Sequence, residues 1–315
     1  EDKFVLVGRA PTANWVKFQA AVGSWKVRLH HDPRSNSRPD GKAIYRTHYR
    51  FQIQGPEADK IFTAINGGPV QEIKFFHVDW INVGSKRVQA LRHGMAGAPG
   101  LEIWGPYADK DYIQSTILEA ARKVGVDLRQ VGSRAYSTNT LESGWIPSPL
   151  PGIYTGDGMM QDYRDWLGAD SYEAAGSIGG SFVSDNIADY YVNPFELGYD
   201  FYIGWKKDDF IGKAALEQQL AAGVPHRFIT LEVHGVTDAD PLGNEPLFAA
   251  DGRIVGRATA GYYGHVLQKS LAIGYIAPEF AEVGTELSIE ILGERKRATV
   301  VIESPYDPAN ADLRA

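Results

Sequence analysis

The most constraining feature of this sequence is a change of pattern near Pro225. After that residue apolar and polar side chains alternate in short runs, as in Ile229–Val233 and Glu286–Ile291. Turn-forming residues separate the runs, at Asp251-Gly252, Gly261, Pro278 and Gly293. Alternation with a period of two is typical of strands that bury one face, and many short strands between turns are typical of a barrel or curled sheet. The sequence therefore predicts a small all-β domain over residues 226–315.

The residues before Pro225 mix helical and strand patterns. Apolar residues recur at helical spacing in two stretches, Ala58–Ile65 and Ile113–Val124. Strands are expected at the following places: Phe4–Val7 (before a helix over residues 11–22), Tyr49–Ile53, Leu101–Trp104, and a hairpin over residues 73–92 that turns at Gly84-Ser85. This order with short links predicts an α+β domain over residues 1–225, in which helices pack on antiparallel sheet.

A long irregular segment, residues 145–185, interrupts this order. Three prolines cluster at positions 147, 149 and 151, and a run rich in glycine and serine follows at Gly176–Ser181. Long irregular segments in compact domains are more often functional loops than spacers. The glycine-rich run lacks the Gly-Lys-Ser/Thr ending of a phosphate-binding loop, so we interpret it as a flexible loop.

Composition excludes several classes of protein. The chain of 315 residues has no cysteine, which excludes disulfides, thiolate metal sites and a cysteine nucleophile and fits a reducing cytoplasm. No stretch approaches the roughly 18 consecutive apolar residues of a membrane span. The net charge of −7 argues against a general nucleic-acid binder. The pair His30-His31 lacks the i, i+4 spacing of a paired metal site, and we expect no metal.

Motifs in both halves of the chain resemble a known family. The stretch Asn193–Leu216 contains Asn-Pro-Phe-Glu-Leu-Gly and Phe-Ile-Gly-Lys-Ala-Ala-Leu, and it is similar to the segment that closes the folate-binding domain of the glycine-cleavage aminomethyltransferase (T-protein) family. Further motifs resemble that family in the same order: Phe51–Pro56, Gly100–Ile103, Gly132–Arg134 with Leu141–Gly144, Asp251–Gly261 and Leu271–Ile276. The resemblance implies a T-protein-like folate domain, a C-terminal barrel, and tetrahydrofolate as co-substrate.

One branch of the family is closer than the others. The run Arg134–Pro149 and the insertion after it resemble the tetrahydrofolate-dependent aryl O-demethylases that act on vanillate and syringate. This resemblance implies a methyltransferase that moves the methyl group of a methoxylated aromatic acid to tetrahydrofolate, in the catabolism of lignin-derived aromatics. The family's folate domain has about a hundred residues upstream of the point that matches Glu1, including an acidic catalytic residue in the aminomethyltransferases, so we expect the chain to lack that N-terminal part.

The same resemblance assigns residues to the folate site. Glu102 lies in the strand whose family counterpart binds the pterin, and one carboxylate can accept two adjacent N–H groups. Arg134 matches the folate-contacting arginine. Without the family, Glu102 would be read as an exposed strand residue and Arg134 as half of a surface ion pair.

The resemblance also assigns residues to the aromatic substrate. Tyr136 is our candidate proton donor to the departing phenol oxygen, because a tyrosine with a pKa near 10 matches a phenol. Arg9 is the candidate for the substrate carboxylate and Trp145 for its ring. The alternatives are a core tyrosine, a surface arginine and a core tryptophan. The surplus of basic residues over residues 26–50 (seven basic, two acidic) is either a solvated loop or a landing surface for a polyglutamylated folate tail.

Other functions stay open at this point. The alternatives are aminomethyl transfer in glycine cleavage, demethylation of a donor such as dimethylsulfoniopropionate, and a non-catalytic folate-binding protein. The Tyr136–Pro149 run disfavours the first two, and the absence of a signature cysteine disfavours the third. The expected partners are small molecules, folate and an aromatic acid, with no nucleic acid and no membrane. The sequence does not determine the preferred methoxy acid or the oligomeric state.

Overall fold

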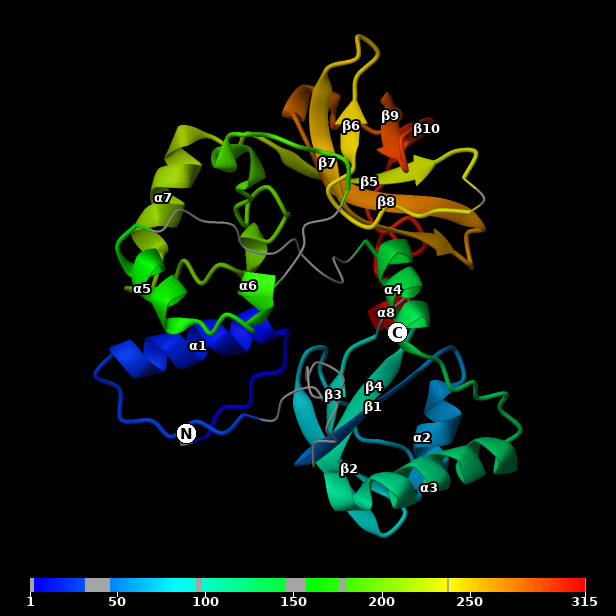
Figure 1. Cartoon of the computed structure of the whole chain (residues 1–315). Helices are drawn as coiled ribbons and strands as arrows, with labels where there is room; N and C mark the ends of the chain where they lie inside the picture. The colour runs from blue at the N-terminus through cyan, green and yellow to red at the C-terminus, as the bar shows by residue number, and fades with distance from the viewer. Residues whose placement is uncertain are drawn as a thin grey trace.

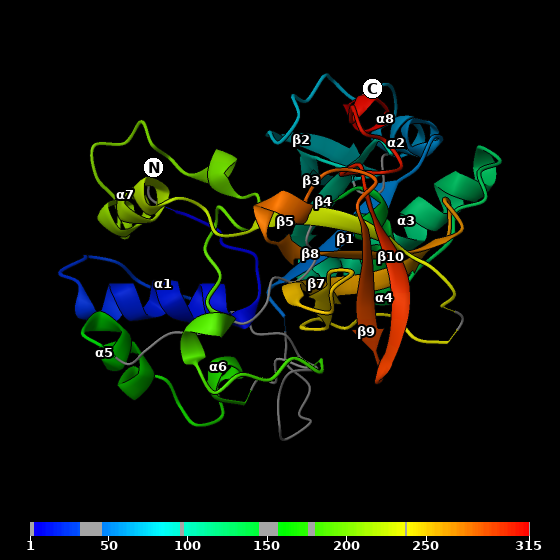
Figure 2. The same ribbon diagram turned by 90° about the horizontal axis from the view of Figure 1, so that it is seen from above.

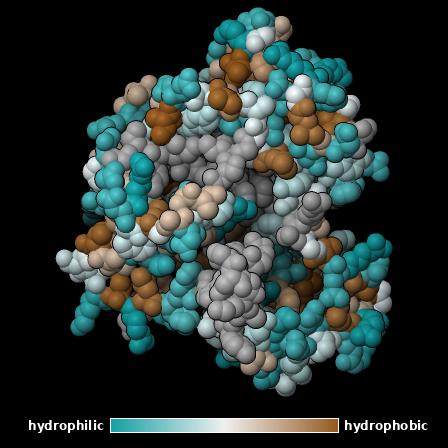
Figure 3. Space-filling view, in the orientation of Figure 1, coloured by the Kyte–Doolittle hydropathy of each residue, from teal (hydrophilic) through white to brown (hydrophobic). Residues whose placement is uncertain are grey.

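The computed structural model describes residues 3–31, 46–94, 98–144, 157–175, 180–236 and 238–314. The elements form three bodies that lie in a triangle in Figure 1: a sheet with two helices, a mostly helical body, and a β-barrel. In Figure 2 the helical body again lies to one side of the other two. Hydrophobic residues appear on the face in Figure 3 as separate patches rather than as one continuous band.

The first body is a four-stranded antiparallel sheet in the order β1-β4-β3-β2. Its strands and helices are β1 (His48–Gln54), α2 (Ala58–Asn66), β2 (Val78–Val83), β3 (Lys86–Arg92), β4 (Gly100–Pro106) and α3 (Lys110–Lys123). Both helices pack on one face, where apolar side chains from strands and helices form a single core. The expected hairpin is confirmed, and Gly84 takes a φ of 58° at its turn, a conformation that favours glycine.

The helical body contains α1 (Ala10–Val22), α5 (Met159–Trp166), α6 (Tyr172–Ala175) and, in Figure 1, α7 (Lys213–Ala222). Trp15 and Phe18 of α1 contact the ring of Tyr163 of α5, each with ring centroids 5.1 Å apart. The Tyr163 hydroxyl donates to Glu173 of α6 at 2.7 Å, and Asn14 donates to the same carboxylate. These contacts tie α1 to residues about 150 positions later.

The expected strand at Phe4–Val7 is wrong. These residues lie outside any strand, and each of the four side chains is at least 61% exposed. No strand among the described residues pairs with them, so an apolar run that favours a strand by composition forms no ladder. The helix expected after it is confirmed as α1, with Pro11 in its first turn, where a missing N–H costs nothing.

The third body is a closed six-stranded barrel in the order β10-β5-β8-β7-β6-β9. Its strands are β5 (Arg227–Val233), β6 (Pro246–Phe248), β7 (Ile254–Gly264), β8 (Lys269–Ile276), β9 (Glu286–Ile291) and β10 (Glu294–Val301). Closure leaves no unpaired sheet edge. The expected fold class, an α+β part followed by a small all-β barrel, is confirmed. The division into domains at residue 225 stays a prediction.

Helix α4 (Ser133–Glu142) joins the first body to the barrel. Leu141 is fully buried with Ala260, Leu271 and Ile273 of the barrel. The buried Glu142 accepts hydrogen bonds at 2.9 Å from the backbone N–H groups of the β7–β8 turn, at residues 266 and 267. The helix is therefore fixed to the barrel at its C-terminal end.

Residues 180–191, the end of the expected insertion and the turn after it, dock on the barrel through Arg257. This arginine of β7 is buried, donates to Asn244 at 2.9 Å and to the carbonyl oxygen of Asp189, and lies over the ring of Phe182 at 4.3 Å. The ring of Tyr190 is 5.2 Å away. The rest of the expected insertion lies partly outside the described residues, including the three prolines. A short helix, α8 (Ala311–Arg314), ends the described chain. Within the described ranges, no helix combines the length and apolarity needed to cross a membrane.

Candidate functional site

The face of the sheet opposite α2 and α3 carries polar and aromatic side chains. Alternation along β1 sends Tyr49 and Ile53 into the core, so Arg50 and Gln52 lie on the opposite face. On β4, Leu101 and Ile103 are in the core, so Glu102 and Trp104 lie on the opposite face. The register pairs Arg50 with Trp104 and Gln52 with Glu102, which brings the four side chains together. This set, Arg50, Gln52, Glu102 and Trp104, is called the sheet-face cluster below.

Glu102 has a partner on each carboxylate oxygen. Its Oε1 pairs with Nη2 of Arg50, and its Oε2 lies 2.7 Å from Nε2 of His93. The Glu102 and His93 side chains are each 14% exposed. Burial, together with the charge of Arg50, lowers the pKa of His93 below its usual 6.5. A neutral imidazole with Nε2–H donating to an ionised Glu102 satisfies this arrangement.

The His93 ring contacts Phe76, a residue whose backbone conformation is rare for an aromatic residue. Phe76, on the segment before β2, has a φ of 58°, and its ring lies against His93 at a tilt of 33° with centroids 5.9 Å apart. A non-glycine residue in this region costs of order 1–3 kcal/mol and is held by its surroundings. The Phe76 side chain is exposed, so its ring borders the approach to His93 and Glu102.

The structure places Tyr136 on α4 close to the sheet-face cluster. Burial raises the pKa of the Tyr136 hydroxyl, and the positive charge of Arg50 acts against that rise. Burial lowers the pKa of Arg50, and the interaction with Tyr136 opposes that shift. Two of the predicted site residues, Glu102 and Tyr136, are thus linked through one arginine. A hydroxyl with a raised pKa stays protonated at neutral pH, as a proton donor requires.

The other predicted residues are not joined to this group in the described structure. Arg9 precedes α1 and donates to the hydroxyl of Tyr172 of α6 at 3.5 Å, so it belongs to the helical body. Trp145 lies outside the described residues. Arg134 lies in α4, but its side chain is outside the described part. The roles given to Arg9, Trp145 and Arg134 stay predictions, as does the metal-free character of the site; the described residues contain no cluster with metal-ligand composition.

Sequence reasoning missed Arg50, His93 and Phe76. Arg50 was counted only as part of the basic stretch 26–50, although its place between Tyr49 and Phe51 in an alternating run marks it as the outward residue of a strand. Arg34, Arg38 and Lys42 of that stretch lie outside the described residues, so the folate-tail hypothesis is not tested. His93 and Phe76 gave no comparable signal.

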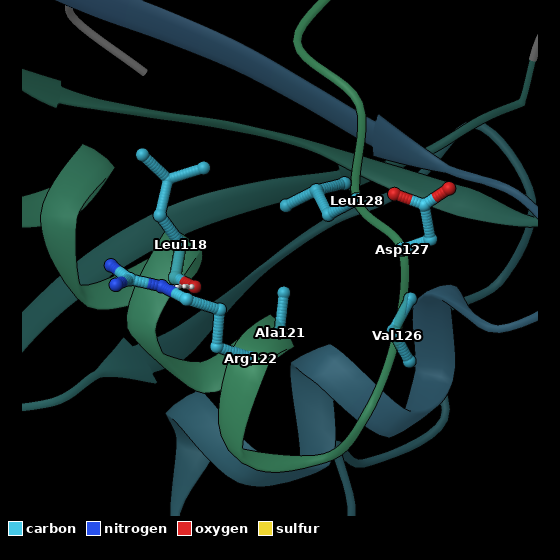
Figure 4. A pocket seen from close by; sticks show the side chains of 6 residues that line it. All are labelled: Leu118, Ala121, Arg122, Val126, Asp127 and Leu128. Carbon is cyan, nitrogen blue, oxygen red and sulfur yellow. Dashed lines mark hydrogen bonds between the residues drawn. The ribbon is translucent and has the colours of Figure 1, made fainter.

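A hollow elsewhere on the first body does not belong to this site. It lies between the end of α3 and the segment after it, and Leu118, Ala121, Arg122 and residues 126–128 line it (Figure 4). Arg122 donates to the Leu118 carbonyl oxygen within the helix at 3.2 Å. None of the residues of the sheet-face cluster lines this hollow.

Comparison with known proteins agrees with the architecture. The GCVT N-terminal domain matches residues 21–148, and the glycine cleavage T-protein C-terminal barrel domain matches residues 226–307. Syringate O-demethylase from Sphingobium sp. (strain NBRC 103272 / SYK-6) is 41% identical over 92% of this chain and 66% of its own length. Human mitochondrial dimethylglycine dehydrogenase is 27% identical over 80% of this chain and 25% of its own length.

A solved structure supports the fold independently. The crystal structure of glycine cleavage system aminomethyltransferase T from Bartonella henselae aligns with 85% of this chain and 60% of its own, with a TM-score of 0.53 and 20% identity. The chain thus spans about two thirds or less of the proteins it matches. Since the two domain models match in order and the demethylase relative covers nearly all of it, this chain belongs to the glycine cleavage T-protein family.

Proposed function

We propose that the protein is a tetrahydrofolate-dependent O-demethylase. It takes the methyl group of a methoxylated aromatic acid, of the vanillate, syringate or 3-O-methylgallate type, and gives 5-methyltetrahydrofolate and a phenol. The supporting observation is the link from Glu102 through Arg50 to Tyr136, which joins a carboxylate suited to a pterin with a hydroxyl suited to a phenol. The 41% identity to syringate O-demethylase supports the aromatic substrate class.

The residues present fit a folate ligand. Glu102 is partly buried and fixed by two partners, and a carboxylate has about four lone-pair sites, so it keeps acceptor capacity for the N–H edge of a pterin. Trp104 beside it offers an apolar ring surface on the same strand face. Tetrahydrofolate would supply a nucleophilic nitrogen, N5, that accepts the methyl group. The protein's part is to position two substrates and to stabilise the oxygen that departs.

Tyr136 is placed to act on that oxygen. When the methyl–oxygen bond breaks, its electron pair stays on the aryl oxygen, and the Tyr136 hydroxyl donates a hydrogen bond or its proton there. General acid assistance of this kind contributes about 10²–10⁴-fold in rate. Arg9, Trp145 and Arg134 complete the proposal, as ligands of the substrate carboxylate, the substrate ring and the folate. We also place the protein in the cytoplasm, because a chain without cysteine needs no oxidising compartment.

The test uses the purified protein, tetrahydrofolate and methyl-deuterated vanillate, syringate and 3-O-methylgallate, with dimethylsulfoniopropionate in the same panel. Mass spectrometry should find deuterated 5-methyltetrahydrofolate and the matching phenol. Transfer from the sulfonium compound alone would refute the aromatic substrate while keeping the family.

A pair of matched tyrosines assigns the role of Tyr136. Tyr136→Phe should lower kcat by about 10²-fold or more, because the proton donor is lost. Tyr112→Phe is the control, since Tyr112 is 40% exposed against 41% for Tyr136, lies on α3 and accepts a hydrogen bond from Ser85 in the β2–β3 turn. Equal rates for the two variants would remove Tyr136 from the mechanism.

A further inference from the structure

Arg50 is held in a defined place on the open face of the sheet. It lies on β1 directly opposite Trp104 of β4, and its guanidinium is 5.6 Å from the centre of that ring. The negative face of the tryptophan ring attracts the guanidinium and helps to hold it there. The side chain is 35% exposed, so it is neither fully buried nor free in solvent.

From this position the guanidinium interacts with two groups, the Glu102 carboxylate and the Tyr136 hydroxyl. Nη2 forms the ion pair with Oε1 of Glu102. Its charge also acts on the Tyr136 hydroxyl, where it opposes the effect of burial on the pKa. A guanidinium has five N–H donors in a rigid plane and stays charged at any pH of interest, so one edge can hold Glu102 while the charge acts elsewhere.

The methyl transfer in the proposed function places negative charge beside this cation. The bond from the methyl carbon to the aryl oxygen breaks, a bond from that carbon to N5 forms, and the electron pair stays on the aryl oxygen. Tyr136 gives its proton to that oxygen and is reprotonated from solvent, which also takes the proton lost from N5. Whether the charge lies on the phenolate or on Tyr136 at a given moment, it lies within the field of Arg50.

We propose that Arg50 is a positioning residue shared by both halves of the site, orienting the Glu102 carboxylate for folate and, through Tyr136, stabilising the charge on the departing phenol oxygen. The inference rests on the proposed function. It adds a residue for which the family motifs gave no role, and it explains why a folate carboxylate and a leaving-group tyrosine share one cation.

The test measures how the rate depends on the leaving group. A series of ring-substituted methoxybenzoates releases phenols of graded pKa, and log kcat is plotted against that pKa. In the wild type the slope should be shallow, because the protein stabilises the developing charge. In Arg50→Gln the slope should steepen, with a loss of roughly 10- to 100-fold for the least acidic phenols and a smaller loss for the most acidic. Arg50→Lys keeps the charge and should restore most of the wild-type slope.

Arg87 gives a matched control. It lies on β3, on the same face of the sheet, with its guanidinium 5.1 Å from the ring of Trp80, and it forms no ion pair with a carboxylate among the described residues. Arg87→Gln should retain the wild-type slope. Folate affinity, measured by titration, should fall about tenfold in Arg50→Gln, the loss of one charge-assisted contact to Glu102, and should stay unchanged in Arg87→Gln.

Parallel plots for the wild type and Arg50→Gln would overturn the inference, because a purely structural role would lower kcat for every substrate by the same factor. Unchanged folate affinity together with an unchanged slope would overturn it as well. Absence of methyl transfer from every ether by the wild-type protein would overturn the proposed function and this inference with it. The two failures are thereby distinguished.

Discussion

His93 and Glu102 meet through Nε2 and Oε2 at 2.7 Å, and Arg50 occupies the other oxygen of the same carboxylate. The arrangement places a histidine beside both a carboxylate and a guanidinium in a partly buried site. Burial and the Arg50 charge lower the pKa of His93, and a backbone hydrogen bond at Gly94 opposes them only in part. Folding therefore favours the neutral form of the His93 imidazole.

The first prediction concerns acid stability. The pKa of His93 is lower in the folded chain than its unfolded value of 6.5. Below pH 6.5 the unfolded chain therefore binds more protons at this residue, and the free energy of unfolding falls as the pH falls toward the folded pKa. His93→Gln should reduce this loss. Urea denaturation at intervals from pH 7.5 to pH 5 measures the free energy of unfolding of each protein. His77→Gln is the control, because His77 is an exposed histidine on the same hairpin. Superimposable pH curves for His93→Gln and the wild type would contradict the prediction.

The second prediction concerns folate affinity. Glu102→Gln keeps the shape of the side chain but removes its charge and leaves Arg50 without its counterion. Hydrogen bonds to a charged group are worth about 1.5–3 kcal/mol, so the affinity for tetrahydrofolate should fall about 10- to 100-fold. A fluorescence titration measures the affinity, and Glu57→Gln, an exposed glutamate paired with Lys60 on α2, is the control. An unchanged affinity would remove Glu102 from the folate site.

The contrast between Arg50 and Glu102 illustrates what the sequence could predict. The alternating run Tyr49–Ile53 predicted a strand, and it also determines that Arg50 and Gln52 share a face. The partner strand and its register cannot be read from that run. The pairing of Gln52 with Glu102 joins positions 50 residues apart, and it alone brings the Glu102 carboxylate beside Arg50.

Helix α4 was missed for a different reason. Its sequence, Ser-Arg-Ala-Tyr-Ser-Thr-Asn-Thr-Leu-Glu, lacks the repeating apolar positions by which the α2 and α3 helices were predicted. Its stability comes from its C-terminal turn, where Leu141 packs in the barrel and Glu142 binds the β7–β8 turn. Family motifs identified Tyr136 on this helix, but only the structure shows that the barrel anchors the helix that carries it. The role of Arg9 stays a prediction: only the family motifs assign it to the substrate, and in the described structure it contacts the Tyr172 hydroxyl.

The third prediction tests that anchor. Glu142 is 1% exposed, and its Oε1 accepts both backbone N–H groups of the turn, at Val266 and Leu267. Glu142→Ala leaves these two donors without an acceptor and should lower the free energy of unfolding by about 2–4 kcal/mol. Glu142→Gln keeps an acceptor oxygen in place and should cost less. Chemical denaturation compares the three proteins. Equal stabilities would show that the turn does not depend on this carboxylate.

The fourth prediction concerns the attachment of residues 180–191 to the barrel. Arg257 is 4% exposed and contributes a hydrogen bond to Asn244, one to the Asp189 carbonyl oxygen, and ring contacts with Phe182 and Tyr190. Arg257→Ala removes all of these at once. Because charge-assisted hydrogen bonds and cation–π contacts are lost together, the free energy of unfolding should fall by about 2–4 kcal/mol.

The effect of Arg257→Ala should be local as well as global, because the contacts join one segment to a closed barrel that has its own core. Limited proteolysis should therefore cut Arg257→Ala within residues 180–191 faster than the wild type, under conditions where the barrel stays folded. Arg253→Ala is the control: its guanidinium pairs with Asp251 at the surface, and exposed pairs of this kind contribute little to stability. A proteolysis pattern in Arg257→Ala that matches Arg253→Ala would show that the segment is held to the barrel by other contacts, and that the buried guanidinium contributes packing alone.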